Sequence, residues 1–344
     1  GGDMNGDGVC NSGNASSTAS CPYPGSWIRL LFNATSAGST LTRTIIRYGG
    51  VLSSNTYPPA MVIADGANLT VNASTFAYAR KHGLYLSGGS STVSNSLFDR
   101  NASSTDAVGL FVEGGGSSVS GNTFSNNAYG LEIWSAPNAQ TFNNTFTANS
   151  SGAALLVGDF GNFHDNSGTG NTPNAFALAG GVTTSASIGT TTFAANPLPY
   201  LLRNELLVVA SSTLALNSGI VIKGFNSGGG QIGKITVQSG GLLFANATAA
   251  SDIVFTSAFD SSVSGTTTAG TPASGDWIGI NVESGGILRM SGFTVRYGGG
   301  ATSGLTISDR GGIRFQSAAT STMSNALIRD NMQQGIRVTG GTPL

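Results

Sequence analysis

The sequence predicts an all-β solenoid, a right-handed parallel β-helix with rungs of about 22 residues. Three observations predict it. Strand-like phrases and Gly turns recur at short intervals, and helical periodicity is missing. Gly, Ser, Thr and Asn, which are poor helix formers, dominate the chain. A coil of parallel strands fits these features because each turn must return the chain one strand spacing higher, about 4.8 Å.

The first repeated element is a short strand phrase with alternating side-chain direction. Its four copies are Gly83-Leu84-Tyr85-Leu86, Gly109-Leu110-Phe111-Val112, Gly130-Leu131-Glu132-Ile133 and Ala154-Leu155-Leu156-Val157. In a coil, equivalent positions stack above one another. We therefore expect Leu84, Leu110, Leu131 and Leu155 to form an interior ladder.

A second phrase follows each of the first three strands and places an asparagine three residues after a phenylalanine. The pairs are Phe98 with Asn101, Phe124 with Asn127, and Phe146 with Asn149. We expect an interior phenylalanine ladder and a stack of turn asparagines whose amides bridge successive rungs. A ligand-binding role for these asparagines is the weaker interpretation. A leucine-rich repeat has a similar period, but no L-x-x-L-x-L frame with a helical segment recurs.

Composition excludes several classes of protein. The 344 residues are only 9% charged and 39% hydrophobic, with a formal net charge of -1. Disorder needs low hydrophobicity with high net charge, and a nucleic-acid partner needs clustered Lys and Arg. No apolar run approaches the roughly 18 residues of a transmembrane segment. We therefore expect a folded chain with no nucleic acid partner and no transmembrane segment.

A longer pseudo-period of about 250 residues divides the chain. The motifs of residues 25–86 return at residues 275–338, beginning with Gly25-Ser26-Trp27-Ile28 against Gly275-Asp276-Trp277-Ile278. We predict a Gly/Ser-rich loop over residues 1–24, a first β-helix run over 25–195 and a second over 196–344. Asn196-Pro197-Leu198-Pro199 marks the junction, within one continuous solenoid.

These motifs resemble the parallel β-helix repeat proteins of bacterial surfaces, which are related in fold to pectate lyases. The resemblance rests on the phrases Ile253-Val254-Phe255-Thr256-Ser257, Gly275-Asp276-Trp277 and Arg296-Tyr297-Gly298-Gly299, with a variable loop opening at Asp260. It implies architecture and not activity. The chain begins without the strand that precedes the Trp loop in that family and stops in mid-rung, so we expect a segment of a longer repetitive protein.

The N-terminal loop carries the sharpest local motif. Asp3, Asn5, Asp7 and the Val9 carbonyl match the first half of a D-x-N-x-D-G calcium loop, in which oxygen ligands alternate along the chain. Asn14 stands at the twelfth position, where a bidentate Glu normally completes the site. We predict a structural Ca²⁺ here, with an ordinary Asp-Asn-Gly turn as the alternative. Cys10 and Cys21 lie in the same loop and predict a disulfide, with two free thiols as the alternative.

No catalytic constellation is recognisable. A pectate lyase-like enzyme would need clustered acids around calcium with an Arg base, and a polygalacturonase-like enzyme would need closely placed Asp residues with a His. The candidate pieces are scattered turn residues, namely Asp99-Arg100, Asp159, His164-Asp165 and Arg329-Asp330. Glycoside hydrolysis requires paired carboxylates, and the sequence names no such pair.

The outward positions of the repeated strand form a candidate contact surface. With Leu84 and Leu86 inside, period two sends Tyr85 outward, followed by Phe111, Glu132 and Leu156 in later rungs, with Trp134 nearby. Such an apolar stripe predicts cover by the chain's own loops, a partner protein or a flat ligand such as a sugar. Eight Asn-x-Ser/Thr sequons are candidate glycosylation sites: Asn14, Asn33, Asn68, Asn72, Asn101, Asn143, Asn149 and Asn246.

Two functions remain open from the sequence. The first is an extracellular or cell-surface structural or adhesive protein, a stiff rod that associates with itself head to tail or laterally, or binds surface glycans. The second is a polysaccharide lyase, a glycoside hydrolase or a carbohydrate-binding module of pectate lyase-like fold. The lack of a catalytic constellation favours the first.

Overall fold

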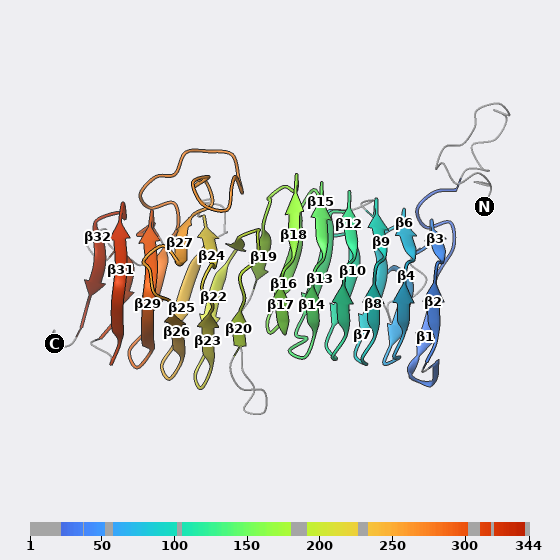
Figure 1. Cartoon of the computed structure of the whole chain (residues 1–344), viewed down its shortest axis with the longest axis horizontal. Coiled ribbons are helices and arrows are strands. Elements are labelled where there is room, and N and C mark those ends of the chain that lie inside the picture. The colour runs from blue at the N-terminus through green and yellow to red at the C-terminus, as the bar shows by residue number, and fades with distance from the viewer. Residues whose placement is uncertain are drawn as a thin grey trace.

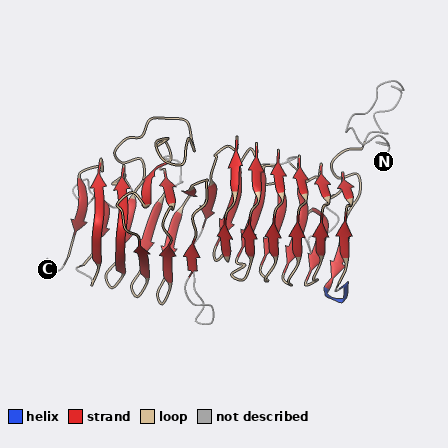
Figure 2. Ribbon diagram, in the orientation of Figure 1, coloured by secondary structure: helices blue, strands red, loops and turns tan. Residues whose placement is uncertain are grey.

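The computed structural model describes residues 22–36, 38–51, 58–101, 105–179, 191–225, 233–301, 310–317 and 320–340. They form one coil of parallel strands whose long axis runs from the first rung to the last (Figure 1). The described helix is a single 3-10 turn, η2 (Ala34–Ser36), beside the first strand (Figure 2). The predicted all-β solenoid is therefore confirmed. The calcium residues Asp3, Asn5, Asp7 and Val9, both cysteines and Asn14 lie outside the described residues.

Sheet A contains 15 strands and runs the length of the coil. Its first part takes one strand from each rung: β1 (Leu30–Asn33), β4 (Ala60–Asp65), β7 (His82–Ser87), β10 (Val108–Glu113), β13 (Tyr129–Trp134), β16 (Gly152–Val157), β19 (Phe176–Ala179), β21 (Tyr200–Leu202), β24 (Val221–Gly224) and β27 (Ile253–Ser257). The sheet continues through β29 (Ile287–Arg296), which also pairs with β26 (Leu242–Asn246) and β31 (Thr322–Arg329), while β26 leads to β23 (Thr213–Leu216) and β20 (Thr191–Phe193).

The other faces of the coil change part-way along it. Sheet B comprises β2 (Thr40–Thr42), β5 (Thr70–Asn72), β8 (Thr92–Ser94), β11 (Ser118–Ser120), β14 (Gln140–Phe142) and β17 (Asn162–His164). Sheet C comprises β3 (Ile45–Arg47), β6 (Thr75–Ala77), β9 (Leu97–Asp99), β12 (Thr123–Ser125), β15 (Thr145–Thr147) and β18 (Ser167–Thr169). Sheet D comprises β22 (Glu205–Val208), β25 (Lys234–Val237), β28 (Gly279–Val282), β30 (Gly311–Phe315) and β32 (Gln334–Val338). Sheets B and C thus end where sheet D begins, while sheet A and a shared hydrophobic core continue across the junction.

Apolar side chains inside the coil stack in register. Phe76, Phe98, Phe124 and Phe146 are fully buried, and their ring centroids lie 4.9, 5.0 and 4.9 Å apart. This confirms the phenylalanine ladder. The ladder also explains the repeated glycine, because a Cβ at Gly130 would lie 2.6 Å from the Phe146 ring.

The predicted register of the fourth strand phrase is wrong by one residue. Leu131 pairs with Ala154, so Leu155 pairs with the outward Glu132 and is half-buried, while Leu156 pairs with the inward Ile133 and is buried in the core. Leu155 therefore leaves the interior ladder, and Leu156 leaves the outer stripe. The misalignment arose because Ala153, and not Ala154, occupies the glycine position of this rung.

The predicted asparagine stack is confirmed. Asn101, Asn127 and Asn149 are buried, and the Oδ1 of each later residue accepts both the backbone N–H and the side-chain N–H of the residue one rung earlier, at 3.0–3.1 Å. Asn171 ends the stack by accepting from Asn149 in the same way. Each Nδ2 also donates to a backbone carbonyl of the preceding rungs, such as that of Phe98 for Asn127. The amide thus satisfies buried backbone groups of the coil at every turn.

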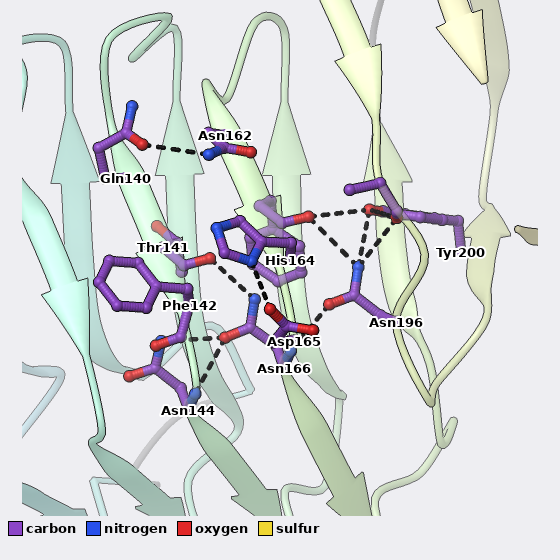
Figure 3. Close-up of polar contacts among 12 residues, drawn as sticks. Gln140, Thr141, Phe142, Asn144, Asn162, His164, Asp165, Asn166, Asn196 and Tyr200 are labelled. Carbon is purple, nitrogen blue, oxygen red and sulfur yellow. Dashed lines mark hydrogen bonds and ion pairs between the residues drawn. The ribbon is translucent and has the colours of Figure 1, made fainter. Parts of the chain in front are cut away.

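A second asparagine ladder, which the sequence interpretation missed, lies at the other turn of each rung. Its members are Asn122, Asn144, Asn166 and Asn196, linked by the same pairs of hydrogen bonds except that Asn196 accepts only the backbone N–H of Asn166. Figure 3 shows the part of the ladder from Asn144 to Asn196. Ser96 and Ser74 continue it toward the N-terminus. The two ladders close the rungs on either side of sheet C.

Candidate functional site

One outward side-chain position recurs along sheet A and defines what we call the outer row. The row contains Leu31, Ile63, Tyr85, Phe111, Glu132, Leu155, Ala177, Leu201, Lys223 and Thr256. It is apolar and aromatic in the N-terminal half and becomes cationic at Lys223. The row therefore offers two different environments on one face of the coil.

The N-terminal half of the outer row is the predicted contact surface, and the structure brings its aromatic members together. The Tyr85 and Phe111 ring centroids lie 5.2 Å apart, and Phe111 meets Trp134 edge-on at 5.6 Å. Tyr85 and Phe111 are less than a tenth exposed, whereas Trp134 is 42% exposed. We call Tyr85, Phe111, Glu132 and Trp134 the aromatic–acid surface. Its solvent-facing member is the tryptophan.

Two carboxylates hold the aromatic side chains of this surface. Glu132 Oε1 accepts a 2.7 Å hydrogen bond from Trp134 Nε1, and Glu113 accepts one from the Tyr85 hydroxyl. Burial raises the pKa of Glu132 to about 7, against the opposing effect of the Trp134 hydrogen bond. Near neutral pH, the protonated and ionised forms of Glu132 are therefore both populated.

The chain itself covers part of the aromatic–acid surface. Lys81 and Asp106 form a 2.6 Å ion pair, and Ser151 donates a hydrogen bond to the Thr105 carbonyl across 46 residues of sequence. Beside them, His82 packs edge-on against Phe111 at 5.6 Å. Burial and the Lys81 charge lower the pKa of His82 to about 3, although Asp106 opposes this, so His82 is neutral in ordinary conditions. Cover by the chain's own loops thus accounts for the buried members but not for Trp134.

The C-terminal half of the outer row lies beneath the long loop that follows β27, residues 258–276, which projects from the coil in Figure 1. Lys223 is fully buried and donates hydrogen bonds to the carbonyls of Asp260 (2.7 Å) and Gly265 (2.8 Å). Burial lowers the pKa of Lys223 to about 8, with Asp260 opposing the shift. A buried lysine therefore ties this loop to the sheet.

Asp260 and Arg296 complete the buried ionic cluster. The Arg296 guanidinium lies 2.5 Å from the Asp260 carboxylate, which also accepts a 2.5 Å hydrogen bond from the Thr256 hydroxyl. Burial raises the pKa of Asp260, but hydrogen bonds from Ser262 and Thr256 and the Arg296 charge outweigh this effect, and the pKa is lowered. Sequence reasoning identified Asp260 and Arg296 only as parts of architectural motifs. Their pairing depends on the path of the loop, which no short motif encodes.

The scattered candidate residues remain scattered. Asp99 with Arg100 and Arg329 with Asp330 are ion pairs between sequence neighbours, at 2.7 and 3.1 Å, and His164 Nδ1 lies 2.7 Å from the carboxyl group of Asp165. His164 also stacks on Phe142 of the preceding rung, with 5.5 Å between ring centroids (Figure 3). Within the described ranges, no group of three or more His, Cys, Asp and Glu side chains is arranged for a metal ion.

The described sequons divide by exposure. Asn33, Asn68, Asn143 and Asn246 are exposed and Asn72 is half-buried. Asn101 and Asn149 are fully buried, and their Nδ2 atoms donate hydrogen bonds within the asparagine stack. A glycan on either residue would break the stack, so these two candidates are corrected to structural residues of the folded coil.

Comparison with known proteins identifies the class. Residues 33–193, from the first rung through β20, match the family model described as a right handed beta helix region. The fold is a right-handed parallel β-helix, which the family match shows over residues 33–193 and which the continuous sheet A extends beyond them. No curated protein and no solved structure matches it. In the described part of the chain, no helix has the length and hydropathy needed to cross a membrane.

Proposed function

We propose that the chain is a non-catalytic adhesive scaffold of the cell exterior, a stiff β-helical rod that binds glycans around Trp134. The observation that carries this proposal is an exposed tryptophan held in one orientation. Trp134 is 42% exposed while its indole N–H is bound by Glu132 and its ring is packed against Phe111. A rigid aromatic face with polar groups beside it provides contact area at low conformational cost, which suits the flat face of a sugar ring.

The test is a screen of the whole chain against immobilised glycans, followed by titration of the best ligand. Trp134→Ala should weaken that binding by about tenfold or more, because an aromatic anchor of this kind dominates a small interface. Phe244→Ala is the matched control, since Phe244 is a similarly exposed aromatic residue, at 39%. It lies on β26 and pairs with Ala215 of β23, away from the aromatic–acid surface. Unchanged affinity in Trp134→Ala, with the β-rich circular dichroism spectrum retained, would refute this site.

End-to-end association is the second part of the proposal. The first rung exposes Ile28, Leu30 and Leu31, and the last exposes Leu327, Ile336 and Val338, each between 42% and 49%. Ile336 and Val338 continue interior ladders through their pairing with Ile313 and Phe315, so a further rung stacked on them would bury these side chains. Electron microscopy of the full-length protein should show rods or filaments, and short dispersed monomers alone would contradict association.

The N-terminal loop supplies a third element, a structural Ca²⁺ held by Asp3, Asn5, Asp7 and the Val9 carbonyl, beside a Cys10–Cys21 disulfide. Both would suit an extracellular location. Calcium should protect residues 1–24 from limited proteolysis, and Asp3→Asn with Asp7→Asn should remove that protection. Equal cleavage with and without calcium would reject the site.

Polysaccharide hydrolysis is the alternative, and one observation favours it. Phe111 pairs with Glu132, so Glu113 lies two residues along the neighbouring strand, and the Cα atoms of Glu113 and Glu132 are roughly 8 Å apart by strand spacing and rise. An inverting glycosidase needs carboxyl groups about 6.5–9.5 Å apart, which this backbone separation allows, and the pKa of Glu132 near 7 suits a general acid. Glycan cleavage by the wild-type chain that disappears in Glu132→Gln would establish this activity and overturn the non-catalytic proposal.

A further inference from the structure

A pocket of about 520 Å³ opens on the same face of sheet A, between the two halves of the outer row. The lining includes the turn Asn171, Thr172 and Pro173 and the loop segment 266–269. The Asn174 N–H ties these two segments together through a 3.2 Å hydrogen bond to the Thr267 carbonyl. Leu201, Arg203 and Phe225 form the remainder of the lining. The volume lies within the usual range for small-molecule sites, about 300–1,000 Å³.

Two residues of the lining each have a buried polar atom with no hydrogen-bond partner among the described residues. The atoms are Arg203 Nε and Thr267 Oγ1, and Thr267 is only 5% exposed. Buried donors and hydroxyls are nearly always paired, and leaving one unpaired costs about 1–3 kcal/mol. Both residues line one pocket, although they are 64 residues apart in sequence and come from different elements. A ligand in this pocket would supply the missing partners.

The charge around the pocket selects an anion. Arg203 is the ionisable side chain of the lining. Lys223 follows Leu201 in the outer row. The buried cluster around it contains two basic side chains, Lys223 and Arg296, and one carboxylate, that of Asp260. Glu132 lies in the other half of the row, and Glu113 lies two residues after its neighbour Phe111. An anionic group on a ligand would thus be favoured at the pocket and disfavoured at the aromatic–acid surface.

Arg203 is already positioned for such a ligand. Its Nη1 donates to the Tyr129 hydroxyl, and its guanidinium carbon lies 5.7 Å from the centre of the Tyr129 ring. Because Nη1 is held in this way, Nε and Nη2 remain on the other edge of the guanidinium and can donate to two oxygens of one group. Phe225 and Leu201 provide apolar surface for the body of the ligand.

We infer that this pocket binds an oxyanion, a carboxylate or a sulfate ester, carried by a glycan whose neighbouring residues reach Trp134. The oxyanion accepts from Arg203 Nε and from the Thr267 hydroxyl. Leu201 lies three strands from Glu132 in the outer row, about 14 Å, so an oligosaccharide of a few residues spans both places. The glycan identity of the ligand rests on the proposed function, whereas the anion site rests on the pocket alone.

The experiment uses isothermal titration of the whole chain with matched oligosaccharides. One pair consists of a uronate-containing oligosaccharide and its carboxyl-reduced form, and the other of a sulfated oligosaccharide and its desulfated form. We expect one anionic member to bind about 10- to 100-fold more tightly than its neutral partner, since a charge-assisted bidentate contact is of that size. The pair that shows the preference identifies the oxyanion.

Arg203→Gln should reduce that preference to less than about threefold by lowering affinity for the anionic member alone. Arg289→Gln makes the same charge change at an exposed residue outside the pocket lining and should leave it intact. Tyr129→Phe removes the hydroxyl that fixes Arg203 and should give an intermediate loss, which a role of Arg203 in stability alone would not produce.

The two proposals fail in different ways. Equal affinity for anionic and neutral members of both pairs, or a preference that survives Arg203→Gln, overturns the anion pocket while leaving glycan binding at Trp134 in place. Affinity for the anionic member that falls in Arg203→Gln but is unchanged in Trp134→Ala supports the pocket and overturns the aromatic–acid surface as the glycan site. Binding of no oligosaccharide in either pair overturns both.

Discussion

The two halves of the coil satisfy their buried polar groups by different means. From β4 to β18, two ladders of asparagines repeat one pair of hydrogen bonds at most rungs. From β21 onward, the described residues instead use single contacts such as Lys223 to two loop carbonyls and Arg296 to Asp260. The repeated asparagine contacts make the N-terminal half a uniform rod. The single contacts in the C-terminal half hold a large inserted loop against the coil.

The two halves also differ in the number of residues between stacked positions. In the N-terminal half, Val71, Val93, Val119 and Thr141 occupy one interior position at intervals of 22, 26 and 22 residues. In the C-terminal half, Ile222, Phe255 and Val295 stack at intervals of 33 and 40. Long insertions are tolerated because loop closure costs little extra entropy, provided that their polar groups find partners. The buried ionic cluster provides those partners.

The largest effect we expect comes from breaking an asparagine ladder. Asn127→Ala removes acceptors for the backbone and side chain of Asn101 and a donor to the Phe98 carbonyl, all in a buried environment. The free energy of unfolding should fall by about 4 kcal/mol, because several buried groups lose partners at once. Chemical denaturation monitored by circular dichroism measures the change.

Asn331 provides the matched comparison in the C-terminal half. It makes the same kind of contacts, donating to the Val295 carbonyl (3.1 Å) and accepting from the Gly298 N–H (2.7 Å), but it is half-buried and outside any ladder. Asn331→Ala should cost about 1–2 kcal/mol. Equal losses for the two variants would mean that stacking in a ladder adds nothing to a single capping contact.

Sequence could predict the N-terminal half because identical positions carry identical residues there. The fold, the phenylalanine ladder and the stack of Asn101, Asn127 and Asn149 follow from a repeat with one physical role per position. The interpretation failed at the fourth strand, where Ala153 replaces the repeated glycine and Ala154 follows it, so the hydrophobic pattern alone left the register open by one residue.

The candidate site was predictable only in part. Tyr85, Phe111, Glu132 and Trp134 follow from strand alternation, which places them on one face. Glu113 was missed, although it lies two residues after Phe111 and the same strand alternation predicts that it points to the same face. Arg203 and Thr267 had no such signal, since a turn and an inserted loop bring them together. Contacts made by loops depend on the whole fold and not on local periodicity.

A smaller effect should come from two buried titratable groups of the outer face, Glu132 and His82, which we expect to change the free energy of unfolding with pH in opposite directions. The pKa of Glu132 is raised from 4.5 to about 7, so the folded state binds more protons between these values and stability falls as pH rises through them. The pKa of His82 is lowered from 6.5 to about 3, so stability rises with pH over that window. The two effects oppose each other between pH 4.5 and 6.5.

Glu132→Gln should therefore abolish the loss of stability up to pH 7, at most about 3 kcal/mol, because one pKa unit corresponds to about 1.4 kcal/mol. His82→Gln should do the opposite and leave a steeper decline with rising pH. Denaturation midpoints at half-unit steps from pH 4 to 8 measure both. A Glu132→Gln profile that parallels the wild type would show that folding does not shift the pKa of Glu132.

Lys223→Met should have the smallest effect on global stability but a large effect on hydrogen exchange in the loop of residues 258–276. Burying the ammonium is unfavourable, as its lowered pKa shows, while its two hydrogen bonds to loop carbonyls are favourable, so removal of both should change the free energy of unfolding by only about 1 kcal/mol. The loop, however, loses its tie to the sheet. Amides such as Thr268 N–H, which bonds the Ala258 carbonyl at 3.3 Å, should exchange hydrogen at least tenfold faster.

Lys234→Met is the control for this variant, because Lys234 forms a partly exposed ion pair with Glu205 at 2.7 Å. It should change global stability by less than about 1 kcal/mol and leave exchange in residues 258–276 unaltered. If Lys223→Met also left that exchange unaltered, the Arg296–Asp260 pair alone would suffice to hold the loop. If instead the whole C-terminal half opened together, the ionic cluster would stabilise the coil itself and the contrast between the two halves would disappear.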